Sequence, residues 1–186
     1  RCARVTGVQT CALPISCRLF IDYTHEEYFK HLSPYFGNTI QGFFTDEPAI
    51  LGRNHHSKMR PYNEYLAEKL KKIGIETKDL PKLFLDNPER QKITEKYQSC
   101  VTDQLEESYY QPISNWCTNH QIYLTGHPHD AHDIGLLKYF HLPGQDVVWR
   151  WIGPEDELGI KGRESVTGKS ASDAARHAQR ERNANE

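Results

Sequence analysis

The spacing of apolar positions predicts several helices along the chain. Apolar side chains recur every three to four residues over 24–36, 62–72 and 89–119, which is the period of a helix with one buried face. A short helix is expected over 134–139, and an Ala-rich helix over 169–178. The first helix opens with the S/T-x-x-E spacing of a capping box at Thr24-His25-Glu26-Glu27, and Pro112 predicts a kink in the longest one.

Short apolar runs between these helices predict strands. Residues 39–45 are β-branched and aromatic and are bounded by turn formers, and similar runs over 121–126 and 146–151 predict two more strands. A fourth strand is expected within 180–185. Strands that alternate with helical crossovers predict an α/β protein with a parallel sheet.

Polar residues gather where the predicted strands end, which favours a (β/α)₈ TIM barrel, whose site is built at the carboxyl ends of its strands. A doubly wound sheet would more usually show a glycine-rich phosphate turn, and the chain contains neither GxGxxG nor GxxxxGK[ST]. Since a whole barrel takes roughly 250 residues, four strands amount to about half of one. The expected fold is therefore a partial (β/α)₈ barrel.

The amino-terminal residues call for a separate interpretation. Residues 5–15 resemble a sequencing-library adapter translated in frame, so residues 1–16 are interpreted as a non-native segment and residues 17–186 as a fragment of a barrel domain. The alternatives are a genuine strand or a signal peptide, for which the apolar run is short. Three cysteines then remain, Cys17, Cys100 and Cys117, without the CxxC spacing of a zinc site.

Composition narrows the classes of function. The 186 residues carry 23 Lys and Arg against 25 Asp and Glu, so the net charge is −2, and no nucleic-acid-binding surface is expected. No apolar run approaches the roughly 18 residues of a membrane helix, so no membrane partner is expected either. With 11% aromatic residues the chain is too rich in large side chains for a disordered protein. The oligomeric state stays open.

Glu47 is the first candidate for chemistry. It follows a hydrophobic strand directly, in the sequence Thr45-Asp46-Glu47-Pro48, and would project into the mouth of a barrel beside Asp46. A carboxyl group in that position suits a general acid. The alternative is an Asp-Glu-Pro turn that only caps the next segment.

Three separated motifs carry a resemblance to a known family. The run from Thr24 to Pro48, the sequence Leu124-Thr125-Gly126-His127, and the segment from Lys169 to His177 that leads to Asn185-Glu186 resemble TIM-barrel glycoside hydrolases of the α-L-rhamnosidase-like kind. The resemblance implies hydrolysis of O-glycosidic bonds in a carbohydrate substrate by two strand-end carboxyl groups, without a cofactor. The matching residues are Glu47 as general acid and Glu186 as base or nucleophile.

The loop after the second strand has three possible uses. His127 and His129, with Asp130 close by, form an HxH motif of the kind that holds a divalent metal in amidohydrolase-type barrels. The family resemblance instead makes them a sugar-binding rim with no metal, and a loop whose polar groups satisfy one another is the third possibility.

The predicted third strand holds two further candidates for substrate binding, Arg150 and Trp151. Because side chains alternate along a strand, either Arg150 points into the barrel or Trp149 and Trp151 do. Burial of at least one tryptophan in barrel packing is the plainer use. A noncatalytic carbohydrate-binding barrel is the remaining alternative to an enzyme. In every case half a barrel leaves open sheet edges, which predicts aggregation.

Overall fold

The computed structural model describes residues 14–48, 50–51, 59–130, 132–146 and 167–185. These residues divide into two compact units. One consists of the described residues within 1–22 and 49–109, and the other of those within 23–48 and 110–186. The two units are called here the helical unit and the sheet unit.

The helical unit packs its helices around one apolar core. Its main elements are α2 (Pro14–Tyr23, of which the last residue belongs to the sheet unit), α4 (Glu64–Lys72), the 3₁₀ helix Thr77–Leu83 and α5 (Arg90–Leu105). Helix α4 begins where the Asn63 side chain accepts a hydrogen bond from the amide of Leu66 at 2.8 Å. Leu66, Leu70 and Val101 are among the buried residues that join α4 to α5.

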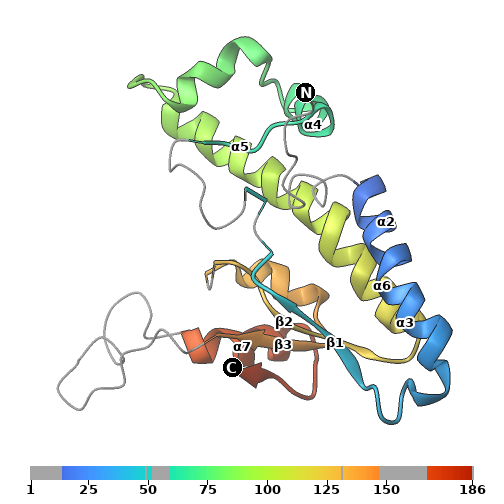
Figure 1. Cartoon of the computed structure of the whole chain (residues 1–186). Coiled ribbons are helices and arrows are strands. Elements are labelled where there is room, and N and C mark those ends of the chain that lie inside the picture. The colour runs from blue at the N-terminus through green and yellow to red at the C-terminus, as the bar shows by residue number, and fades with distance from the viewer. Residues whose placement is uncertain (1–13, 49, 52–58, 131, 147–166, 186) are drawn as a thin grey trace. The chain divides into compact units, whose positions relative to one another are not determined.

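The sheet unit is built on four parallel strands in sequential order, seen in Figure 1. The strands are β1 (Gly42–Asp46), β2 (Tyr123–His127), β3 (Leu142–Gln145) and β4 (Ala184–Asn185). The helices that accompany them are α3 (His25–Leu32), the 3₁₀ helix Ser33–Tyr35, α6 (Gln111–Asn119), the 3₁₀ helix Ile134–Tyr139 and α7 (Thr167–His177). The order β1-β2-β3-β4 has no reversal, so it lacks the switch point of a doubly wound sheet. The predicted parallel sheet is confirmed, as an open α/β arrangement.

Phe43 marks the helix-covered face of the sheet. Its ring centroid lies 5.7 Å from that of Trp116 on α6 and 4.5 Å from that of His25 on α3. The next residue, Phe44, points to the opposite face and is 54% exposed. The sheet therefore has one buried face, beneath α3 and α6 (Figure 1), and one open face.

Two expectations about helices are corrected or refined. Thr24 has helical torsions (φ −118°, ψ −72°) and makes no side-chain cap, because its hydroxyl bonds the His25 ring at 2.7 Å while Glu27 contacts Lys30 and His31. The prediction of a capping box at Thr24 is therefore wrong. In the long helix, the π-helix Glu106–Tyr110 separates α5 from α6 and ends two residues before Pro112. Pro112 cannot donate to the carbonyl four residues earlier, which accounts for the irregular turn.

The third strand of the structure lies where the sequence predicts none. The structure places β3 at Leu142–Gln145, and residues 147–151 lie outside the described residues. Pro143 and Gly144 argue against a strand by sequence alone. In the structure Gly144 allows close approach, because a Cβ there would lie 2.7 Å from the carbonyl oxygen of Gly126 on β2. The other strands and helices are found at or near their expected positions. Pro14–Ser16 form the start of α2, and the adapter interpretation of residues 1–16 stays a prediction.

Candidate functional site at the carboxyl ends of the strands

The carboxyl ends of the strands bring several candidate residues to one edge of the sheet. Strand β1 ends at Asp46 and β2 at His127, and these two residues are directly paired in the parallel register. Glu47 follows β1, and Gln145 ends β3. Asp46 and His127 are about eighty residues apart in the sequence. They lie side by side because parallel strands place their carboxyl ends at the same edge of the sheet.

Asp46 and His127 form the central contact of this edge. The His127 Nε2 atom lies 3.7 Å from Asp46 Oδ1, with the His127 side chain 3% exposed and that of Asp46 59% exposed. The Phe44 ring lies against the His127 ring with centroids 5.8 Å apart and the planes at 74°. Burial and the contact with the Phe44 ring fix the orientation of the His127 imidazole relative to the exposed Asp46 carboxylate.

Glu47 has an unusual backbone conformation. Its φ is +40°, a region that non-glycine residues rarely adopt. Such conformations cost of order 1–3 kcal/mol and gather at functional sites, where the surrounding structure holds them. The half-buried Glu47 side chain therefore leaves the strand at an angle that regular β geometry would not give.

The loop after β2 separates the two histidines of the HxH motif. His127 is buried, whereas His129 is exposed. Asp130 accepts hydrogen bonds from the backbone amide of His132 at 2.9 Å and lies 3.0 Å from its ring nitrogen Nδ1. Burial, helped by the negative charge of Asp130, raises the pKa of Asp133. Within the described ranges no group of three His, Cys, Asp or Glu side chains is placed to hold a metal ion.

Gln145 is a residue that the sequence reasoning missed. It is 1% exposed at the end of β3, on the same sheet edge as Asp46 and His127. The signal that could have found it is the one used for the other strands, a polar residue that ends a strand. The sequence does not single out Gln145, because Pro143 and Gly144 are unfavourable in a strand and β3 is therefore not predicted.

Three expected site residues lie outside the described part of the chain: Arg150, Trp151 and Glu186. Glu186 directly follows β4, whose Asn185 pairs with Gln145 of β3. No helix in the described part of the chain is long and apolar enough to cross a membrane.

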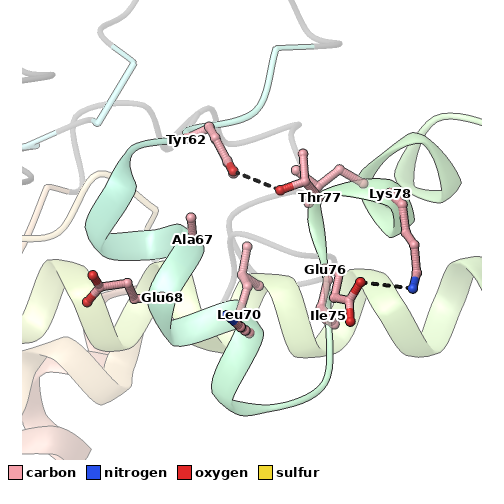
Figure 2. A pocket seen from close by; sticks show the side chains of 10 residues that line it. Tyr62, Ala67, Glu68, Leu70, Ile75, Glu76, Thr77 and Lys78 are labelled. Atoms are coloured by element: carbon pink, nitrogen blue, oxygen red, sulfur yellow. Dashed lines mark hydrogen bonds and ion pairs between the residues drawn. The ribbon is translucent and has the colours of Figure 1, made fainter.

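A separate cavity of about 480 Å³ belongs to the helical unit (Figure 2). It lies between α4 and the 3₁₀ helix Thr77–Leu83, with Leu70 and Ile75 at its base. The Tyr62 hydroxyl is 3.4 Å from that of Thr77, and Lys78 pairs with Glu76 at 2.8 Å. Glu76 and Lys78 belong to the same segment, and Glu68 of α4 also lines the cavity.

Comparison with known proteins identifies one similar fold. The chain superposes on the structure of a rhamnosidase from Novosphingobium sp. PP1Y with a TM-score of 0.68 and 14% sequence identity. The match covers 95% of this chain and 17% of the rhamnosidase chain. No protein-family model and no curated protein matches the sequence.

Proposed function

We propose that the chain is part of the catalytic domain of a glycoside hydrolase with a (β/α)₈ barrel. Two observations support the proposal: the sequential parallel sheet, and the likeness in fold to one segment of a rhamnosidase. The chain spans about a sixth of that enzyme. Because one fold hosts many functions, the proposed chemistry rests on the residues at the sheet edge.

The observation that carries the proposal is the placement of Glu47. It leaves β1 at the carboxyl edge with a positive φ, next to Asp46 and the buried His127. In the proposed reaction the Glu47 carboxyl donates its proton to the glycosidic oxygen as the bond to the anomeric carbon breaks. Glu186, directly after β4, either attacks that carbon or takes a proton from the attacking water.

The remaining candidates would bind the sugar. Asp46, His127, His129 and Asp130 offer the imidazoles and carboxylates that hydrogen-bond to hydroxyl groups, and the buried amide of Gln145 adds a donor and an acceptor. Arg150 and Trp151 are proposed substrate contacts from the segment that follows β3.

The test is a survey of aryl and alkyl glycosides, α-L-rhamnosides included, with the complete catalytic domain that contains this chain, as wild type and as two variants. Glu47→Gln removes the acid and keeps the shape, and Glu64→Gln, at an exposed residue of α4, is the matched control. We expect one sugar to be accepted, with a loss of rate in Glu47→Gln that is small for its aryl glycosides with good leaving groups and about 10²–10⁴-fold for its alkyl glycoside, and no loss in Glu64→Gln.

Two results would redirect the proposal. Loss of activity in EDTA with Glu47→Gln unaffected would favour a metal-dependent amidohydrolase that uses His127 and His129. Sugar binding without any hydrolysis, equal in wild type and Glu47→Gln, would favour a noncatalytic carbohydrate-binding barrel.

A further inference from the structure

The helical unit is inserted in the connection that leaves the candidate active site. Strand β1 ends at Asp46, and α6, whose Trp116 packs on Phe43 of the sheet, begins only at Gln111. Between them the chain forms α4, the 3₁₀ helix Thr77–Leu83 and α5. A crossover between parallel strands needs only about a dozen residues. Because the connections that follow barrel strands carry substrate-binding residues, the cavity of this unit is a candidate for substrate recognition.

This cavity has an apolar floor and an aromatic rim. Its volume of about 480 Å³ lies within the range of roughly 300–1,000 Å³ that is typical of small-molecule sites. Leu70 and Ile75 are 2% and 4% exposed and belong to the core of the helical unit, so packing within this unit closes the cavity from below. The Tyr62 ring, 47% exposed, lies at the rim opposite Thr77 (Figure 2). An apolar floor and an exposed ring suit a ligand with a flat apolar face.

Two charged side chains of α4 are available to a ligand. Glu68 and Lys71 line the cavity, and both are exposed. Within the described part of the chain neither takes part in an ion pair or a side-chain hydrogen bond, whereas Glu76 and Lys78 neutralise each other. The lining thus carries two carboxylates and two ammonium groups, so its net charge is zero. It offers acceptors at Glu68 and donors at Lys71 without favouring a charged ligand.

The two hydroxyl groups at the rim add further donors and acceptors. The Tyr62 and Thr77 oxygens are 3.4 Å apart, at the long end of hydrogen-bond distances. Only one of the two hydroxyl protons can lie between these oxygens. The other proton and the remaining lone pairs are available to a ligand whose own groups both donate and accept.

We propose that this cavity binds a neutral sugar ring, and that it holds a part of an oligosaccharide substrate other than the sugar whose bond is cleaved. Sugar hydroxyl groups donate to Glu68 and accept from Lys71, while the C–H face of the ring covers Leu70 and lies against Tyr62. The part in substrate binding rests on the proposed glycosidase function. The sugar site itself does not, since it uses none of the residues at the sheet edge.

The test is an NMR titration of the complete catalytic domain that contains this chain, in its Glu47→Gln form to prevent turnover. The neutral probes are the methyl glycosides of L-rhamnose, D-galactose and D-glucose. The charged probes are D-galacturonate and D-galactosamine, which have the galactose ring. We expect at least one neutral glycoside to shift the signals of Tyr62 and Thr77 with a Kd of about a millimolar. The charged probes should bind no more tightly than the best neutral one.

Variants at two exposed positions locate the bound sugar. Tyr62→Ala should weaken binding of that glycoside at least about fivefold, and Glu68→Ala about three- to tenfold. Glu64→Ala, at an exposed residue of α4 outside the cavity, is the matched control and should leave the affinity unchanged. The same spectra show that each variant is folded.

Several results would overturn the sugar site. They are the absence of shifts in the helical unit with all three neutral glycosides, tighter binding of a charged probe, and unchanged affinity in both Tyr62→Ala and Glu68→Ala.

A kinetic measurement separates the two parts of the proposal. With Glu47 intact, kcat/KM for an oligosaccharide, relative to that for the nitrophenyl glycoside of the cleaved sugar, should fall several-fold in Tyr62→Ala. An unchanged ratio would overturn the part in substrate binding. If the wild-type domain cleaves no glycoside, the proposed function fails together with that part, and the titration still decides whether the cavity is a sugar site.

Discussion

His25 shows how one side chain ties the sheet to its helices. It is 6% exposed, and its ring lies between Phe43 of β1 and Trp116 of α6, with centroids 4.5 and 5.1 Å away. Burial lowers its pKa to about 4, with the nearby His120 acting in the same direction and Glu26 in the opposite one. The His25 imidazole of the folded sheet unit is therefore neutral at neutral pH.

This burial makes stability depend on pH. The unfolded chain binds a proton at His25 near pH 6.5 and the folded chain only near pH 4, so the free energy of unfolding falls as the pH drops between these values. We expect a loss of about 2–3 kcal/mol between pH 7.5 and 4.5 that His25→Gln lacks. Urea unfolding at low protein concentration measures it. The matched control His31→Gln, on the exposed face of α3, should keep the wild-type pH dependence, and an unchanged pH dependence in His25→Gln would contradict the account.

The sequence could identify single candidate residues but not their partners. Glu47 and His127 were found because each follows an apolar run, which is a local signal. The contact of His127 with Asp46, the exposure of His129 and the positive φ of Glu47 depend on strand register and on packing between residues far apart in the chain. Periodicity carries no information about these features.

At the scale of elements, regular patterns were predictable and irregular ones were not. The helix predicted over 62–72 corresponds to α4 within about two residues, and the one predicted over 89–119 spans α5, the π-helix and α6. The sequence does not predict β3, because Leu142-Pro143-Gly144-Gln145 lacks β-forming residues, and this strand joins the sheet through the close approach that Gly144 permits. The Thr24 capping box failed because the hydroxyl found a partner in His25. Tertiary contacts outweighed local preference in both places.

The pairing of β1 with β2 depends on Gly126. Its φ is +121°, and a Cβ there would lie 2.1 Å from the carbonyl oxygen of Thr45. We expect Gly126→Ala to lower the free energy of unfolding by more than about 2 kcal/mol, since both the torsion and the close approach oppose a side chain. Gly135→Ala, with nothing within 4 Å of the new methyl group, is the matched control and should stay within about 1 kcal/mol of wild type. Equal stability of the two variants in urea would refute this role.

At the scale of the whole molecule, the sheet is open. Among the described residues β1 pairs only with β2 and β4 only with β3, and the face that carries Phe44 has no covering layer. Unpaired parallel edges and exposed aromatic side chains promote association between chains. We expect the isolated chain to sediment as a concentration-dependent oligomer or aggregate, and Phe44→Ser to reduce this. A monomer at all concentrations with a single cooperative thermal transition would contradict the expectation.

The central claim is that Glu47 protonates the leaving group of a glycoside. The most direct measurement is the rate of Glu47→Gln relative to wild type on glycosides of one sugar that differ only in leaving group. A nitrophenolate leaves without being protonated, whereas an alkoxide needs a proton to leave. The loss of rate in Glu47→Gln should therefore be small for the nitrophenyl glycoside and grow to about 10²–10⁴-fold for an alkyl glycoside. A loss that is the same for every leaving group, or no loss at all, would contradict the role of Glu47 as the general acid.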